Sequence, residues 1–193
     1  MDPFETTLRD GGRALLRPLQ PEDRWRIAEG FDRLTPAARY LRFGQHIEEL
    51  SEELLDQLMD VDDKYHVAWV ALDPERLDEP GLGVARFIRE PFETYAAEAA
   101  VTVAEGQRGR GIGTLLIKVI SQVAREVGIT EFRNYVLAEN DAMLGVFRHL
   151  GAQVTSVGRV LRLDMPLTVE DVDTDDAATQ ILRAMAEHVA GDA

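Results

Sequence analysis

The sequence contains no cysteine among its 193 residues, and this absence excludes several kinds of site. A chain without thiols forms no disulfides, offers no thiolate ligands to zinc and has no cysteine nucleophile. The four histidines are also scattered, with no metal-ligand spacing among them: His46, His66, His149 and His188. We therefore expect no metal site.

Long hydrophobic runs are missing as well. No apolar run approaches the roughly 18 residues that a membrane-spanning helix needs. The first residues, MDPFETTLRDGG, lack the basic start and the apolar centre of a signal peptide. We predict a cytoplasmic protein that has no membrane partner.

Basic residues are few, because 21 lysines and arginines stand against 35 acidic residues and give a net charge of −14. Such a balance argues against nucleic acid as a partner, since nucleic-acid surfaces are broadly basic. An acidic surface attracts protonated amines or a lysine-rich protein face, and it also serves solubility. Charge alone does not decide between these two roles.

The hydrophobic pattern predicts one α+β domain with a mostly antiparallel sheet. We expect helices at 21–33, 35–43, 51–59, 112–128 and 140–150, and strands at 14–19, 66–72, 82–90, 96–104, 129–137 and, as a pair, 152–167. We divide the chain into an N-terminal extension (1–12), a domain (13–166) and an acidic tail (167–193) with a weak helix near 176–189.

A glycine turn carries the main chemical signal, in the stretch VTVAEGQRGRGIGT at 101–114. A strand that leads through glycines into a helix presents free backbone amides and the positive end of the helix dipole, which favour phosphate. The turn is not a P-loop, because it lacks the Lys-Ser/Thr pair, and it is a poor dinucleotide fingerprint, because Thr114 occupies the third glycine position. A merely flexible loop remains the alternative, but an amphipathic helix follows directly.

The segment Arg108-Gly-Arg-Gly-Ile-Gly113 resembles the pyrophosphate-binding signature Q/R-x-x-G-x-G/A of the GNAT superfamily of acetyl-CoA-dependent N-acyltransferases. The resemblance covers about residues 13–165 and implies the GNAT fold, a mixed, mostly antiparallel central sheet flanked by helices. The N-terminal part, with LRPLQPED and LTPAARYLRF, resembles bacterial protein lysine acetyltransferases that modify acyl-CoA synthetases. These are often fused to a regulatory domain, which we do not expect here.

The resemblance implies acetyl-CoA as cosubstrate. The backbone of residues 101–103 would pair with the pantetheine arm, and the amides of 108–114 would hold the pyrophosphate. Asn140 would reach the pantetheine or the sulfur, and it can cap a helix at the same time. The cofactor-binding set is Val101, Thr102, Val103, Arg108, Gly109, Arg110, Gly111, Ile112, Gly113, Thr114, Asn140, Met143 and Phe147.

GNAT enzymes transfer the acetyl group directly to an amine, and an amine attacks only when it is neutral. Because a lysine is protonated at neutral pH, with a pKa of about 10.4, a general base is needed. Glu98, ten residues before Arg108, stands where the lysine-acetylating subgroup carries its catalytic glutamate; an exposed strand residue is the alternative. Glu105 is the nearest competitor. The amide of Val103 would stabilise the oxyanion.

Phe147 stands where many GNAT enzymes have a tyrosine that acts as the general acid. Phenylalanine cannot protonate the departing sulfur, but a thiol with a pKa of about 8.5 leaves without an obligatory acid. We interpret Phe147 mainly as a core residue.

The sequence favours an acetyl-CoA-dependent N-acetyltransferase that acts on a protein lysine. The alternatives are a small-amine acetyltransferase (for an aminoglycoside, a polyamine or an amino acid) and a non-catalytic acyl-CoA sensor. The acceptor amine is the expected partner, and we expect a monomer or a homodimer.

Overall fold

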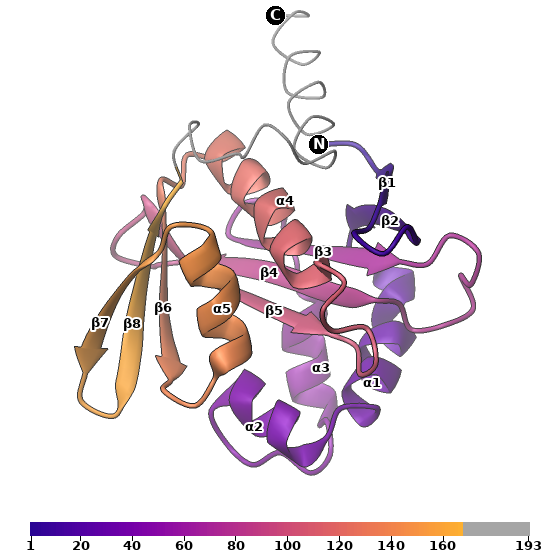
Figure 1. Cartoon of the computed structure of the whole chain (residues 1–193), viewed down its shortest axis with the longest axis horizontal. Coiled ribbons are helices and arrows are strands. Elements are labelled where there is room, and N and C mark those ends of the chain that lie inside the picture. Colours follow the sequence, from indigo (N-terminus) through magenta and orange to yellow (C-terminus); the bar gives the residue numbers. More distant parts are fainter. Residues whose placement is uncertain (168–193) are drawn as a thin grey trace, which may run out of the picture.

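A mixed sheet forms the centre of the structure, a computed structural model that describes residues 1–167 (Figure 1). Within these residues the strand order is β1-β2-β3-β4-β5-β6-β8-β7. The strands are β1 (Phe4–Thr7), β2 (Arg13–Pro18), β3 (His66–Leu72), β4 (Gly83–Arg89), β5 (Ala96–Val103), β6 (Glu131–Leu137), β7 (Gln153–Val157) and β8 (Val160–Pro166). Every described pair is antiparallel except β5–β6. The predicted α+β class is confirmed.

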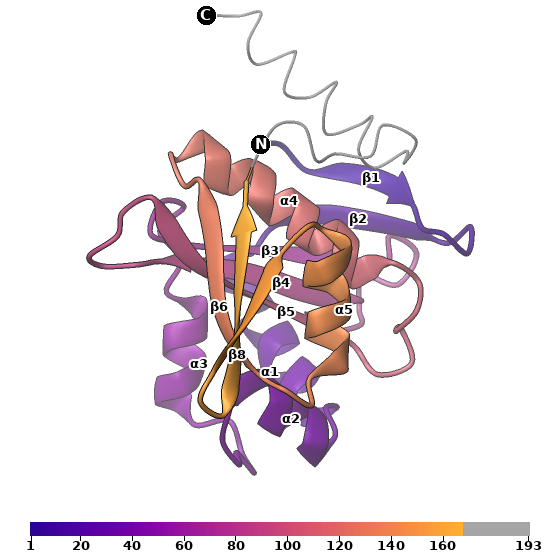
Figure 2. The same ribbon diagram turned by 60° about the vertical axis from the view of Figure 1, so that its left-hand side comes forward.

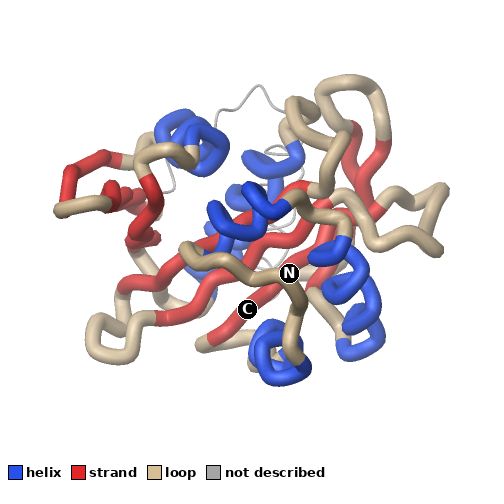
Figure 3. Tube along the Cα trace, turned by 90° about the horizontal axis from the view of Figure 1, so that it is seen from below, coloured by secondary structure: helices blue, strands red, loops and turns tan. Residues whose placement is uncertain are grey.

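Helices cover both faces of the sheet (Figures 1 and 2). One face packs against α4 (Ile112–Glu126) and α5 (Asp141–His149) in the larger hydrophobic core. The other carries a smaller core with the 3₁₀ turn η1 (Pro21–Asp23) and the helices α1 (Arg24–Asp32), α2 (Pro36–Phe43) and α3 (Glu52–Met59) near it. Figure 3 views the molecule from the side of these three helices. The helix predicted near 176–189 lies outside the described residues.

Helix α4 is the best-predicted element. Its apolar positions recur at helical spacing and form a stripe whose residues Leu115, Leu116, Val119, Ile120 and Val123 are buried. The stripe lies on β3, β4 and β5, which brings the start of α4 to the end of β5. Gly128 follows the helix with φ of +83°, as expected for a C-terminal glycine cap.

The sequence did not predict strand β1, which lies inside the stretch assigned as an N-terminal extension. Phe4 pairs with Leu16 across β1 and β2, and its ring lies 6.5 Å from that of Trp69. Only four residues of alternating burial make this strand, too short a pattern to stand out in the sequence. The turn after β1 consequently lies beside the start of α4, where residues 9 and 10 meet the glycine turn.

Strands β5 and β6 pair over only a short distance. Their register joins Ala96 with Glu131 and Ala97 with Phe132, and the two strands then separate, as Figure 1 shows. Beyond Ala97, β5 stays bonded to β4 and β6 stays bonded to β8. The edge of β5 that faces β6 is therefore left without a strand partner along residues 99–103.

Candidate functional site

A groove of about 510 Å³ lies where β5 and β6 separate, bounded by the glycine turn, α5 and the end of α2. It collects most of the predicted site: Glu98, Val101, Thr102, Val103, Arg108, Gly109, Gly111, Ile112, Gly113, Thr114, Asn140 and Met143. Two predicted members, Arg110 and Phe147, do not line it.

The glycine turn presents bare backbone to this groove. Gly109 and Gly111 have φ of +81° and +86°, a conformation that residues with a side chain rarely adopt. Gly111 is the N-cap of α4, so the amides of the first helical turn have no carbonyl partner within the helix. Those amides and the helix dipole favour an anion, and the turn therefore fits a diphosphate.

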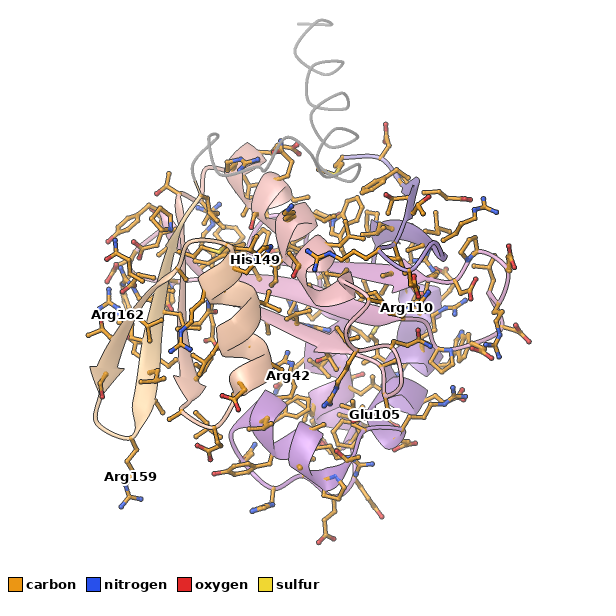
Figure 4. All side chains as sticks on the ribbon, viewed as in Figure 1. Arg42, Glu105, Arg110, His149, Arg159 and Arg162 are labelled. Atoms are coloured by element: carbon orange, nitrogen blue, oxygen red, sulfur yellow. The ribbon has the colours of Figure 1, made fainter. Side chains whose placement is uncertain are left out.

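The arginines around the turn differ from the sequence prediction. The side chain of Arg110 is directed at the β1–β2 turn, where its Nε donates to Asp10 at 2.5 Å, and it also donates to Gln107. Figure 4 labels it beside that turn. The pKa of Asp10 is lowered, chiefly by this hydrogen bond. Arg110, a member of the predicted cofactor-binding set, is thus held by other residues of the protein and does not line the groove.

Arg9 supplies positive charge that the sequence analysis missed. It lines the groove, and a Cβ added to Gly111 would lie 3.3 Å from its side chain. Within residues 1–167, Arg9 has no hydrogen bond or ion pair. Arg108, the predicted cation, also lines the groove, and it pairs with Glu105 at 3.0 Å. Nothing in the local sequence marked Arg9, because only the fold brings it to the turn.

The side chain of Asn134 on β6 binds the β5 backbone just beyond the point where the backbone pairing of β5 and β6 ends. Its Oδ1 accepts a hydrogen bond from the amide of Ala99 at 2.7 Å. Since strand amides alternate in direction, those of Val101 and Val103 point to the same open edge. A pantetheine arm can pair there as an added strand. The signal in the sequence was an asparagine at a buried position, between Phe132 and Val136 in the strand alternation.

Asn140 connects two helices at the far end of the groove. Its Oδ1 accepts from the amide of Met143 at 3.1 Å, which confirms the predicted N-cap of α5. Its Nδ2 donates to the carbonyl of Leu41 in α2 at 3.2 Å.

Phe147, in the same helix α5, is fully buried in the core. The interpretation of Phe147 as a core residue is confirmed, and this member of the predicted cofactor-binding set does not line the groove.

Glu98 is the only carboxylate that lines the groove in the described part of the chain. Its side chain stays open to solvent, yet partial desolvation of the carboxylate raises its pKa. The charge of Arg42 opposes this shift, and that of Glu90 adds to it. Glu105, the competing base, pairs with Arg108 and does not line the groove.

Arg42, at the end of α2, is a second groove residue that the sequence analysis missed. Its guanidinium lies 5.0 Å from the ring of Phe43, and no ion pair or hydrogen bond holds it within residues 1–167. Burial lowers the pKa of Arg42, and the charge of Glu98 opposes that shift. Figure 4 labels Arg42 between the lower helices and β5.

No cluster of three or more His, Asp or Glu that could hold a metal occurs in residues 1–167. In the same part of the chain, no helix combines the length and the apolar character needed to cross a membrane.

The sequence profile of the acetyltransferase (GNAT) family matches residues 31–152, most of the chain. The chain belongs to the GNAT family of acetyltransferases. It is 37% identical over 150 residues to Acetyltransferase PA5475 of Pseudomonas aeruginosa, covering 78% of this chain and 80% of that protein. It is 32% identical over 177 residues to Acetyltransferase Pat of Mycolicibacterium smegmatis, covering 92% of this chain and 50% of that protein.

Solved structures agree with this assignment. The GNAT domain of S. lividans PAT superimposes with a TM-score of 0.78 at 27% identity, covering 85% of this GNAT chain and 96% of that domain. The spermidine N-acetyltransferase of Vibrio cholerae, solved with CoA and spermine, shares the fold with a TM-score of 0.63 at 18% identity, covering 80% of this chain and 95% of that one. This chain spans half the length of the Pat relative.

Proposed function

We propose that this acetyltransferase transfers an acetyl group from acetyl-CoA to the side-chain amine of a protein lysine, with Glu98 as the general base. The observation that carries the proposal is the position of Glu98, the one carboxylate lining the groove in residues 1–167, on the strand whose edge toward β6 is free of backbone pairing beyond Ala97. The resemblance of LRPLQPED and LTPAARYLRF to bacterial protein lysine acetyltransferases supports a lysine as the acceptor.

The glycine turn is the proposed binding site of the cosubstrate's diphosphate. The amides of residues 108–114, aided by the side chains of Arg9 and Arg108, would hold it there. The backbone of Val101 and Val103 would bind the pantetheine arm. Acetyl-CoA then supplies an activated thioester at the Glu98 end of β5, where its C–S bond breaks as the C–N bond to the amine forms.

Glu98 accepts the proton that the amine loses during attack. The raised pKa of Glu98 lies closer to neutral pH than the pKa of an ordinary glutamate. The carboxylate is therefore a stronger base and a better proton acceptor. The amide of Val103 lies five residues along β5 from Glu98, about 16 Å at the rise of a strand, so we assign it to the pantetheine arm and not to the oxyanion expected from the sequence. Because Phe147 is buried and has no acidic group, the departing sulfur takes its proton from water.

The Glu98→Gln variant tests this assignment. It should lower kcat for acetyl transfer by at least about tenfold and leave the Kd of acetyl-CoA, measured by calorimetry, unchanged. Glu105→Gln is the matched control, because it removes the competing carboxylate outside the groove, and it should keep wild-type kcat. Wild-type protein that binds acetyl-CoA but acetylates no amine would instead indicate a sensor.

The acceptor is identified by a label-transfer screen. Labelled acetyl-CoA is offered with a cell proteome and, separately, with free polyamines, aminoglycosides and amino acids. A protein acceptor predicts labelled lysines in the proteome. Turnover of a single small amine without protein labelling would reject the lysine assignment and keep the acetyltransferase chemistry.

A further inference from the structure

A second cavity, of about 200 Å³, lies on the α1–α3 side of the sheet and adjoins the groove at Arg42, Ala100 and Thr102. Arginines are concentrated in its wall: Arg26, Arg33, Arg42, Arg76 and Arg86. Its acidic residues are fewer: Asp73, Glu79 and Glu105. This local excess of positive charge occurs in a protein with a net charge of −14.

Three of these arginines are neutralised by carboxylates. Arg26 pairs with Asp23 at 3.0 Å. Arg33 pairs with Glu29, and Arg76 pairs with Glu79. In residues 1–167, neither Arg42 nor Arg86 has a carboxylate within ion-pair distance.

Arg86 is a buried cation without a counter-charge among the described residues. It is 4% exposed, donates to the carbonyl of Leu58 at 2.7 Å and lies 3.1 Å from Nε2 of His66. Burial, followed by the charge of Arg42, lowers the pKa of Arg86 to about 9. His66 supplies no anion, and its own pKa is lowered by burial and by Arg86. Buried charges in proteins are normally paired.

Arg86 and the reacting groups share one face of the sheet. Arg86 is directly opposite Ala100 in the register of β4 and β5, and residues 98, 100 and 102 of β5 point to the same side. Ala100, Arg42 and Arg86 all line the second cavity. Glu98 influences Arg42 electrostatically but does not pair with it, so the guanidinium keeps its donors available.

We propose that Arg42 and Arg86 form a carboxylate-binding subsite beside the thioester, for a carboxylate carried by the acyl group or by the acceptor. Arg42 binds the carboxylate directly, and the charge of Arg86 beneath it strengthens the attraction. The cavity has the volume of roughly six to seven water molecules, enough for an acyl chain of a few carbons that ends in a carboxylate. This inference rests on the proposed transfer reaction and names its substrate class.

Two matched pairs of substrates test the subsite and distinguish the sources. In the first arm, succinyl-CoA and butyryl-CoA, which differ at the chain end in a carboxylate or a methyl, donate to the same lysine peptide. In the second arm, acetyl-CoA donates to Nα-acetyl-lysine or to its amide. We expect the carboxylate-bearing member of at least one pair to have a kcat/KM about tenfold or more above its partner.

Variants of Arg42 assign the preference to the subsite. Arg42→Met keeps the apolar stem and should abolish the preference, whereas Arg42→Lys should keep part of it. Arg33→Met is the control, because it removes a wall charge that Glu29 already neutralises, and it should keep the full preference. The test uses variants of Arg42 and not of Arg86, because Arg86 is buried and replacing it can unfold the protein.

The result that overturns the subsite is the absence of a preference in both arms, or a preference that persists in Arg42→Met. If no amine is acetylated at all, the proposed function fails separately. Calorimetry then tests the subsite from binding affinity alone, with the same ligand pairs on wild type and on Arg42→Met. Wild type should bind the carboxylate-bearing member of at least one pair more tightly, and Arg42→Met should not.

Discussion

Asn134 and Ala99 are joined by a hydrogen bond from the backbone amide of Ala99 to the side-chain oxygen of Asn134, 2.7 Å long. It lies where β5 and β6 stop pairing, so a side chain replaces the missing backbone partner. Because the amide of Ala99 can only donate, it fixes the orientation of the Asn134 side chain. The bond holds the two strands together at the inner end of the groove.

The first prediction concerns stability at this bond. Asn134→Leu removes the acceptor and leaves the buried amide of Ala99 unsatisfied, which should lower the free energy of unfolding by about 1–3 kcal/mol. Asn134→Gln keeps an uncharged amide oxygen that can accept from the amide of Ala99, and it serves as the control because it buries no charge. Urea denaturation of both variants measures the difference. Equal stability of Asn134→Leu and wild type would contradict the structural role given to this bond.

The second prediction is a pH profile with two opposite shifts. Glu98 acts as a base only when deprotonated, so kcat/KM should fall as the pH drops through its raised pKa. Arg42→Met removes the cation that lowers this pKa and should move the acidic limb to higher pH. Glu90→Gln removes the anion that raises it and should move the limb to lower pH.

Acetyl transfer to one peptide, measured across the acidic range, provides the comparison. The ionisation of the acceptor lysine is common to all variants, so a difference between the acidic limbs reports on the enzyme. Limbs that coincide in wild type, Arg42→Met and Glu90→Gln would show that another group controls the rate.

The third prediction separates two arginines near the glycine turn. Arg9 lines the groove without a partner in residues 1–167, whereas Arg110 is paired with Asp10. Arg9→Ala should raise the Kd of CoA by about tenfold, the cost of one charge-assisted hydrogen bond. Arg110→Ala should change it far less. Calorimetry at low and high salt should show the Arg9 effect shrinking with ionic strength.

Local sequence patterns predicted the elements that frame the site. The apolar stripe of α4, the glycines before it and Asn140 at the start of α5 each combine residue type with spacing over one or two turns. Such signals are contained in neighbouring residues, and the structure reproduces them. The assignment of Glu98 as the base came from the family resemblance and stays a prediction.

Residues brought to the site by distant contacts carried no such signal. Arg9 reaches the groove because the short strand β1 pairs with β2, and Arg42 reaches it because α2 packs beside β5. The direction of Arg110 depends on Asp10, 100 residues away in the chain. A pattern in the local sequence contains no information about partners at that separation.

The last prediction contrasts two glycines at the start of α4, Gly113 and Gly111. A Cβ added there would lie 3.5 Å from the side chains of Val103 and Val146, an ordinary contact, and the residue is inside α4 with a negative φ. Gly113→Ala should therefore keep the stability or raise it by up to about 1 kcal/mol, the helix-propensity difference. Because the signature that this segment resembles accepts alanine at the position of Gly113, acetyl-CoA binding should stay close to that of wild type.

Gly111→Ala is the matched comparison, since its φ of +86° strains any residue with a side chain. That variant should lower the melting temperature as well as the affinity, because it strains the turn itself. Thermal denaturation and calorimetry on both variants give the two quantities. If Gly111→Ala binds acetyl-CoA as tightly as wild type, the pyrophosphate end of the cosubstrate does not approach the first turn of α4, and its proposed binding site is incorrect.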